Sequence, residues 1–374
     1  MRILHVAGAR PNFMKVAPVR RALACYDSVH QTLVHTGQHY DANMSDIFFR
    51  HLGMPQPDVN LAVGSGSHAW QTAEIMSRFE PVVLERKPDL VLVYGDVNST
   101  LAAALVCAKL FVPVGHVEAG LRCFDRTMPE EVNRLVTDQI ADLLFTSSVD
   151  GDQNLLREGV ASERIHLVGN VMIDTLARLL PRALTRWPVQ CLGTALPVLR
   201  TSDECEREGL AVKRYGLVTL HRPSNIDNAT LLARIMEGLI DISRDLPLIF
   251  PIHPRLRPRL GDWQFAIHNS QLHCVDPLGY LDFLALQRHA TVVITDSGGI
   301  QEETTYLGIP CLTVRERTER PVTTILGTNT LVGHDMERLQ IEVRRTLAGD
   351  GKQGQIPPLW DGHAAERIAH MILT

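Results

Sequence analysis

The sequence predicts an α/β fold with two doubly wound parallel sheets. Short β-branched runs alternate with longer helical patterns throughout the 374 residues, as in parallel sheets covered by helices. The predicted strands are almost continuously apolar, which is expected when helices cover both faces of a sheet. The pattern loosens at residues 181–200, which are rich in Pro, Gly and Arg. We therefore expect two domains, 1–171 and 172–357, with a cleft between them at the carboxyl ends of both sheets.

The first predicted domain opens with the strand "RILHVAG", which stops at Gly8 before a helix begins. The run "HAWQTAEIMSRFEPVVLERK" has apolar residues at helical spacing, whereas "PDLVLVYGD" is a short apolar run ended by turn residues. In chain order we expect a strand at 2–8, a helix at 12–26, a strand at 30–39, a helix at 68–87, a strand at 88–96, a helix at 99–110, a strand at 112–120, a helix at 129–140, and strands at 141–148 and 165–170.

A second series of short apolar runs follows, each ended by a loop or helix signal. The final segment "HAAERIAHMILT" has helical spacing, and we expect the helix at about 358–374 to pack back on the first domain. The predicted strands of the second domain are 215–221, 246–254, 271–278, 290–299 and 309–316.

Composition excludes several classes of protein. A formal net charge of -5 gives no basic footprint, so we expect neither a nucleic-acid nor a membrane partner. Seven cysteines without a C-x-x-C pair indicate reduced cytoplasmic usage. The longest apolar segment is interrupted by Lys109 and Pro113 before it reaches membrane-spanning length. The histidines show no H-E-x-x-H and no Cys/His cluster, so we expect no metal.

The first strand-to-helix turn, "GARPNFMK", differs from a P-loop, because it lacks the second Gly before Lys15 and the Ser or Thr after it. Gly8 nevertheless permits a tight turn, and Arg10 and Lys15 lie near a helix start, where an anion is favoured. The alternative is that both are ordinary solvated cations.

The segment "TDSGGIQEE" follows an apolar strand and opens a helix. Its glycines would let a pyrophosphate approach backbone N–H groups, and Glu303, just over one turn later, would accept hydrogen bonds from a ribose. The alternative is an ordinary N-cap.

Three carboxylates are acid-base candidates. Asp96 and Glu118 end strands, at the sheet edge where such folds place ligands. Asp96 could equally cap the next helix. Glu130 begins the helix that carries Arg134, so the alternative for Glu130 is an i,i+4 ion pair. Glu118 has the weakest structural alternative, because an acid joined to so apolar a strand is costly unless partnered.

His221 also follows a strand, in the second domain. A lone histidine is usually an ordinary hydrogen-bonded residue, but one that faced these carboxylates across a cleft would matter for catalysis.

Eight motifs in order, "GARPNFMK", "TGQHYD", "YGDVNST", "HVEAGLR", "PEEVNR", "TLHRPSN", "DSGGIQEE" and "RTERP", resemble those of the non-hydrolysing UDP-N-acetylglucosamine 2-epimerases. The resemblance implies a GT-B type fold of two Rossmann-like domains, a homodimer, and interconversion of UDP-GlcNAc and UDP-ManNAc without a cofactor. In that family UDP is eliminated to give a 2-acetamidoglucal and then added back.

The resemblance also implies residue roles. Proton transfer and sugar binding would fall to Asp96, Glu118 and Glu130, and phosphate departure to His221. UDP would be held by Arg10, Ser297, Gly298, Gly299 and Glu303 with Phe283 near the uracil, and the cationic lining would be completed by Lys15, Arg134 and Arg320.

Three departures from the family pattern affect these expectations. Leu278 stands where many members have a nucleotide-binding Gln. Family members that are activated by a second UDP-GlcNAc carry a Gln-His-Arg-Gln type sequence. In this chain Gln38 and His39 are followed by Tyr40 and Asp41, so we expect weak or absent allosteric activation. The short loop between Glu118 and Glu130 is similar to that of relatives acting on UDP-2,3-diacetamido-glucuronic acid. Three alternatives to a UDP-GlcNAc 2-epimerase therefore stay open. The protein would be a 2-epimerase of UDP-2,3-diacetamido-glucuronic acid, a hydrolysing epimerase that releases ManNAc, or a non-catalytic sugar-nucleotide-binding regulator.

Overall fold

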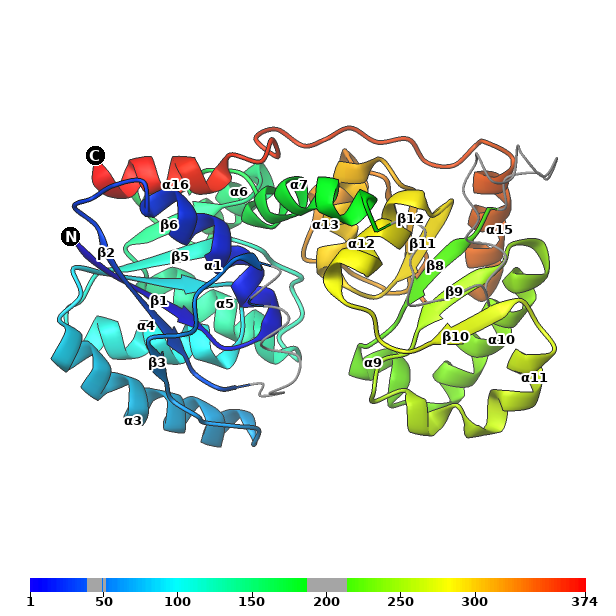
Figure 1. Cartoon of the computed structure of the whole chain (residues 1–374), viewed down its shortest axis with the longest axis horizontal. Helices are drawn as coiled ribbons and strands as arrows, with labels where there is room; N and C mark the ends of the chain where they lie inside the picture. Colours follow the sequence, from blue (N-terminus) through cyan, green and yellow to red (C-terminus); the bar gives the residue numbers. More distant parts are fainter. Residues whose placement is uncertain (39–48, 50–51, 187–213) are drawn as a thin grey trace. The chain divides into compact units, whose positions relative to one another are not determined.

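The computed structural model describes residues 1–38, 49, 52–186 and 214–374, and it divides into two compact units (Figure 1). Unit 1 contains Met1–Arg178 and Pro358–Thr374, and unit 2 contains Leu179–Pro357. The boundary thus lies inside helix α7 (Val171–Leu184), whereas the sequence placed the junction at residue 171.

Unit 1 is built on one seven-stranded sheet in which every neighbouring pair is parallel. The order reverses direction between β1 and β4, which creates the kind of switch point where ligands bind in such folds. In spatial order the strands are β3 (Val59–Asn60), β2 (His30–His35), β1 (Arg2–Ala7), β4 (Leu90–Tyr94), β5 (Val114–Ala119), β6 (Leu143–Thr146) and β7 (Ile165–Leu167).

Apolar helix faces cover this sheet. Ile75 and Phe79 of α3 and the alanines of α4 share one buried cluster with strand residues such as Val91 and Val93. The helices of unit 1, besides α7, are α1 (Arg10–Leu23), α3 (His68–Arg86), α4 (Asn98–Lys109), α5 (Pro129–Ile140), α6 (Val149–Arg157), the 3₁₀ helix η1 (Ser162–Arg164) and α16 (Ala364–Leu373).

The C-terminal helix α16 is anchored in unit 1 beside α1. The Asp174 carboxylate accepts hydrogen bonds from the N–H groups of Ala364 and Ala365, at 3.1 and 2.7 Å. The buried indole of Trp360 donates to the Ser147 carbonyl at 2.8 Å. These contacts satisfy backbone donors that a helix start would otherwise leave unpaired.

Unit 2 contains a six-stranded parallel sheet. Its core joins Ile235 and Leu239 of α10 and Leu339 of α15 to Val218 and Phe250 of the strands. The strand order is β10 (Leu272–Val275), β9 (Leu248–Pro251), β8 (Gly216–Thr219), β11 (Val292–Thr295), β12 (Cys311–Thr313) and β13 (Asn329–Leu331). The helices are α9 (Pro223–Ile226), α10 (Ala229–Asp245), η4 (Arg257–Arg259), η5 (Gly261–Trp263), α11 (Gln264–His268), α12 (Tyr280–His289), α13 (Gly298–Leu307), α14 (Pro321–Ile325) and α15 (Met336–Leu347).

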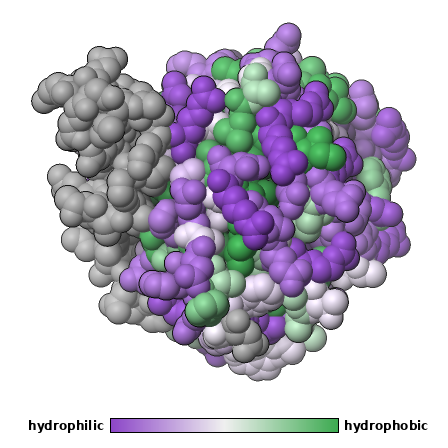
Figure 2. Space-filling view, turned by 90° about the vertical axis from the view of Figure 1, so that its right-hand side faces the viewer, coloured by the Kyte–Doolittle hydropathy of each residue, from purple (hydrophilic) through white to green (hydrophobic). Residues whose placement is uncertain are grey.

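On the face drawn in Figure 2, hydrophilic residues predominate and hydrophobic ones are interspersed among them. Within the described part of the chain, no helix is both long enough and apolar enough to cross a membrane.

Candidate functional site

The turn between β1 and α1 is closed by its own side chains. Asn12 Oδ1 accepts hydrogen bonds from the N–H groups of Gly8 and Ala9 at 3.1 and 2.8 Å, and Asn12 Nδ2 donates to the Tyr94 carbonyl at 2.7 Å. Gly8 is required because a Cβ there would lie 2.0 Å from Ser99 Oγ. Arg10 is exposed at the helix start, whereas Lys15 is buried, so the alternative of two solvated cations is wrong for Lys15.

Lys15 and Glu118 form a buried ion pair, with Lys15 Nζ 2.5 Å from Glu118 Oε2. Each residue exposes only 5% of its surface. Glu118 has φ of 74°, and the pairing register of β5 shifts between Val117 and Ala119. A left-handed non-glycine residue at a bulge is strained, and such strain gathers at functional sites.

The buried His116 contacts the residue before Asp96 and, through Asp138, the turn after Glu118. His116 Nδ1 is 2.6 Å from Asp138 Oδ1, and His116 Nε2 is 2.8 Å from the Gly95 carbonyl. Both partners are oxygen acceptors, so each ring nitrogen of His116 faces an acceptor. Asp138 Oδ2 accepts from Gly120 N–H at 3.1 Å and pairs with Arg122 at 2.7 Å. His116 and Asp138 therefore connect the turn before Asp96 to the turn after Glu118.

Burial raises the pKa of Asp138, but the charges and hydrogen bonds of His116 and Arg122 outweigh burial and hold that pKa below its usual value. Asp138 is therefore an ionised carboxylate at neutral pH.

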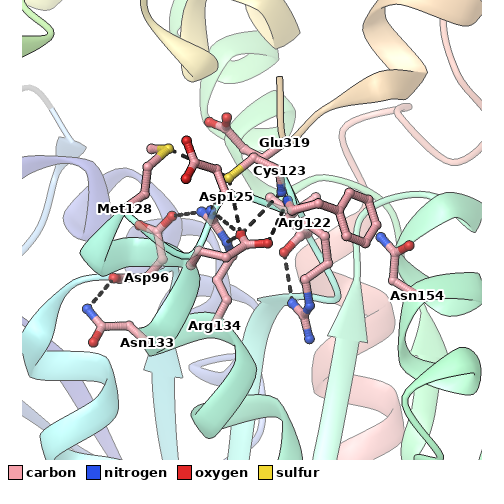
Figure 3. A network of polar contacts seen from close by, with 12 residues as sticks. Asp96, Arg122, Cys123, Asp125, Met128, Asn133, Arg134, Asn154 and Glu319 are labelled. Carbon is pink, nitrogen blue, oxygen red and sulfur yellow. Dashed lines mark hydrogen bonds and ion pairs between the residues drawn. The ribbon is translucent and has the colours of Figure 1, made fainter. Parts of the chain in front are cut away.

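Arg134 pairs with the carboxylate of Asp96 (Figure 3). It also pairs with the carboxylate of Glu131. The carbonyl of Asp96 accepts a hydrogen bond from Asn133 Nδ2 at 2.8 Å. Val97, rather than Asp96, is the N-cap of α4. The capping alternative for Asp96 is therefore wrong, and its carboxylate is held by α5.

Glu131, in the first turn of α5, makes tertiary contacts beyond its own helix. Its buried carboxylate accepts hydrogen bonds from Phe124 N–H at 2.8 Å and Cys123 N–H at 3.2 Å and lies 2.6 Å from Arg134 Nη2. Burial raises the pKa of Glu131, but Arg134 outweighs it and lowers that pKa overall. Glu131 thus fastens the loop that leads from β5 into α5.

The i,i+4 ion pair offered as the alternative for Glu130 is not what the structure shows, since Arg134 pairs with Asp96 and Glu131. Glu130 is half-buried in the first turn of α5. Unit 1 therefore brings together Lys15 and Glu118 in one pair and Asp96 and Arg134 in another.

In unit 2, His221 is oriented by Asp296. His221 Nδ1 lies 2.8 Å from Asp296 Oδ1, and the same carboxylate accepts N–H bonds from His221 and Arg222. Burial raises the pKa of Asp296, but His221 and these N–H groups outweigh it and lower that pKa. Asp296 therefore orients the His221 ring through Nδ1, and no hydrogen bond to His221 Nε2 is found among the described residues.

The start of α13 contains Ser297 as N-cap and Gly298 as the first helical residue. Among the described residues, the Ser297 hydroxyl makes no capping bond to α13, so the ordinary capping alternative is not what the structure shows. A Cβ on Gly298 would lie 2.3 Å from Arg320 Nη1, so only glycine permits this approach. Arg320 is buried against Glu302, at 2.9 Å, and Glu319.

Farther along α13, Glu303 is buried and accepts a hydrogen bond from Tyr280 Oη at 2.9 Å. Phe283 is half-buried on α12, and Gly299 lies in the first turn of α13. The sequence analysis did not single out Tyr280. The available signal was its position at the start of the helix that carries Phe283. The sequence segment used to predict weak allosteric activation continues into residues 39–41, which lie outside the described residues.

Two units, each built on a parallel α/β sheet, place the chain in the class of two-domain, Rossmann-like proteins. Within that class, the chain belongs to the UDP-N-acetylglucosamine 2-epimerase family, whose model matches residues 21–373. The predicted family is thereby confirmed.

Individual relatives agree with this assignment. A UDP-N-acetylglucosamine 2-epimerase of Methanocaldococcus jannaschii is 40% identical over 377 residues, covering 100% of this chain and 99% of the relative. A UDP-2,3-diacetamido-2,3-dideoxy-D-glucuronate 2-epimerase of Pseudomonas aeruginosa is 39% identical over 378 residues, covering 100% and 99%. The crystal structure of the Methanocaldococcus jannaschii enzyme with UDP-GlcNAc and UDP has a TM-score of 0.86 at 39% identity, covering 100% and 99%. The predicted GT-B type fold is confirmed.

Proposed function

We propose that this protein is an isomerase that interconverts UDP-GlcNAc and UDP-ManNAc by eliminating and re-adding UDP. Family membership supports the reaction type. The observation that carries the proposal is the strained, buried Glu118 beside Lys15 at the carboxyl end of β5. An acid held in this way suits proton transfer to or from a bound sugar.

The C2 proton is not adjacent to a carbonyl and is hard to remove directly, so its removal by a base is coupled to the departure of UDP. A carboxylate takes that proton while the bond between C1 and the diphosphate oxygen breaks, which leaves a C1–C2 double bond and free UDP. A proton is then delivered to C2 from the opposite face, and the diphosphate oxygen adds back to C1. We assign these transfers and sugar binding jointly to Asp96, Glu118 and Glu130.

Departure of UDP needs stabilisation of negative charge. We propose that His221, held by Asp296, contacts the phosphate, with Arg10, Lys15, Arg134 and Arg320 supplying cationic character. The start of α13 would offer the backbone N–H groups of Gly298 and Gly299 and the hydroxyl of Ser297 to the diphosphate, whereas the Ser297 N–H itself donates to Thr295 Oγ1 at 3.0 Å. Glu303 would bind the ribose, and Phe283 would lie near the uracil.

A second substrate, UDP-2,3-diacetamido-glucuronic acid, is favoured by one observation. The Pseudomonas aeruginosa relative named for that sugar is as similar to this chain as the UDP-GlcNAc enzyme of Methanocaldococcus jannaschii is, at 39% against 40% identity. The reaction would be the same, since both sugars carry a 2-acetamido group.

Product analysis tests the proposal. Purified protein is incubated with UDP-GlcNAc and, separately, with UDP-2,3-diacetamido-glucuronic acid, and the products are separated by chromatography. UDP-ManNAc is the expected product of the first incubation. Free ManNAc with UDP would show hydrolysis instead, and turnover of the second substrate alone would reassign the sugar. Lack of turnover with every UDP-2-acetamido sugar would refute the proposal.

We further propose a cytoplasmic homodimer. Support for the location comes from cysteine usage, since Cys25, Cys107, Cys123, Cys274 and Cys311 are all free. Support for the dimer comes from the family resemblance. Light scattering on a size-exclusion column should give twice the mass of 41.6 kDa, and a monomer across micromolar concentrations would contradict it.

A further inference from the structure

A line of hydrogen bonds leads from His221 to the loop that precedes α15. His221 Nδ1 contacts Asp296 Oδ1 at 2.8 Å, Asn225 Nδ2 contacts Asp296 Oδ2 at 3.1 Å, and His334 Nε2 contacts Asn225 Oδ1 at 3.0 Å. Asp296 and Asn225 are fully buried, and His334 is half-buried. All four residues lie in unit 2.

The direction of each hydrogen bond follows from the acceptors. Asn225 Nδ2 faces both Asp296 Oδ2 and the Val314 carbonyl, at 3.1 and 3.0 Å, so both of its hydrogens are used. The Asn225 Oδ1 must therefore be the acceptor for His334, whose Nε2 donates. His334 thus supplies the donor to the oxygen of the buried Asn225 amide, and the nitrogen of the same amide donates to the carboxylate that holds His221.

His334 is itself held by Glu316. The Glu316 Oε1 accepts the backbone N–H of His334 at 3.2 Å and lies 3.3 Å from its Nδ1. Gly333 before it has φ of 61°, and a Cβ there would lie 2.9 Å from Glu316 Oε1. The loop conformation therefore presents the ring to Asn225 in a defined orientation.

The ring of His334 borders a surface hollow of about 790 Å³ that Glu316 and Arg338 also line. A smaller side chain at position 334 would widen this open hollow and would leave the hydrophobic core of unit 2 intact. The effect of substituting His334 therefore reports the loss of its hydrogen bond and not a loss of core packing.

We propose that His334 is a positioning residue for the 2-epimerase reaction, acting on His221 through Asn225 and Asp296. The proposal rests on the proposed function, in which His221 contacts the departing phosphate. Without His334, the Asn225 amide keeps its bonds to Asp296 and to the Val314 carbonyl but loses the donor to its Oδ1. Asn225 and the Asp296 carboxylate are then held less firmly, and the His221 ring samples more orientations. Partners that orient a functional imidazole at metal sites are worth 10–100-fold when removed, and here roughly tenfold is expected.

Steady-state kinetics of three variants test the proposal. His334→Ala should lower kcat about tenfold with little change in the dissociation constant of UDP. His334→Gln should recover most of the loss, because its amide nitrogen can donate to Asn225 Oδ1. Arg338→Ala, which removes an exposed side chain from the same hollow, should behave as wild type. Turnover of His334→Ala within about twofold of wild type, or a His334→Gln variant as slow as His334→Ala, would overturn the proposal.

A readout that does not depend on turnover separates this proposal from the proposed function. In protein labelled with ¹⁵N-histidine, the ring nitrogens of His221 should shift in His334→Ala and return towards wild type in His334→Gln. Unchanged His221 signals in His334→Ala would overturn the positioning role. A wild-type protein that turns over no UDP-2-acetamido sugar would refute the proposed function while this spectroscopic result still stood.

Discussion

Glu118 occupies a conformation that few residues adopt. Its φ of 74° costs on the order of 1–3 kcal/mol for a non-glycine residue, and its carboxylate is buried against Lys15 at 2.5 Å. A structural ion pair alone needs no such backbone, because a surface pair would form without strain. The strain is explained if the position serves chemistry.

Replacing Glu118 by Gln keeps the side-chain shape but removes the proton-transfer group. Turnover should fall by at least about 100-fold, as the loss of a general acid or base does, while the dissociation constant of UDP measured by calorimetry stays close to wild type. Near-normal turnover would return Glu118 to a structural role.

The variant Gly298→Ala tests the proposed nucleotide site, because it adds a single methyl group there. In Gly298→Ala the new Cβ would lie 2.3 Å from Arg320 Nη1 and 2.6 Å from Glu319 Oε1, so this buried ion pair must move. UDP binding should weaken about tenfold, or about 1.4 kcal/mol.

The matched control for Gly298→Ala is Gly261→Ala. A Cβ at Gly261 meets no described atom within 4 Å, and this variant should bind UDP as wild type does. Equal binding by both variants would remove Gly298 from the nucleotide site.

At the scale of elements, the ends of β4 and β5 are held together by buried charge. Asp138 on α5 contacts His116 in β5, Arg122, and the N–H of Gly120. Because His116 also donates to the Gly95 carbonyl, Asp138 positions the turns that carry both Asp96 and Glu118.

Asp138→Asn should lower both stability and turnover. Breaking a buried ion pair costs about 3 kcal/mol, measurable by urea denaturation. The lowered pKa of Asp138 means that its stabilisation is fully present above the unfolded value near 3.9 and is lost as pH falls through the folded value. The stability difference from wild type should therefore be constant from pH 8 to pH 5, and a difference that narrows within this range would contradict the assignment.

Asp142→Asn is a matched control for the effect on turnover. Asp142 accepts the N–H of Val114 at 2.8 Å, at the opposite end of β5 from Glu118. Loss of this hydrogen bond should lower the stability of the protein but leave turnover close to that of wild type. Equal losses of turnover in both variants would show that general weakening of β5 is responsible.

The sequence predicted most of the elements, because apolar runs and helical spacing are local signals. The two-residue β3 is too short to leave such a pattern, and β13 reads Asn-Thr-Leu, which is not an apolar run. The partner of Arg134 shows the same limit. Helical spacing offered only Glu130 as an alternative partner, but tertiary packing brings Asp96 to Arg134, and no local pattern encodes that contact.

At the scale of the whole molecule, the predicted roles are distributed over two units. Unit 1 holds Lys15, Asp96 and Glu118, and unit 2 holds His221 and the start of α13. The motifs revealed which strand ends are polar, but they could not reveal Glu131, Asp138 or Asn225, whose roles depend on what they meet in the folded chain. Catalysis as proposed requires both sets of residues to act on one sugar nucleotide.

UDP alone should stabilise the folded protein, because it binds the native state. At 100 times its dissociation constant, the expected gain is about 2.7 kcal/mol in wild type, seen as a higher midpoint in thermal unfolding. Glu118→Gln should show the same gain, since Glu118 is assigned to the sugar. Loss of the gain in that variant would place Glu118 in the UDP site instead.

The most direct measurement is incorporation of solvent deuterium at C2. The protein is incubated with UDP-GlcNAc in D₂O, and the C2 position is followed by NMR. Proton removal and return at C2 predict deuterium at C2 of the UDP-ManNAc that forms. UDP-ManNAc that retains its original C2 proton, or no exchange with any UDP-2-acetamido sugar, would contradict the elimination and re-addition of UDP.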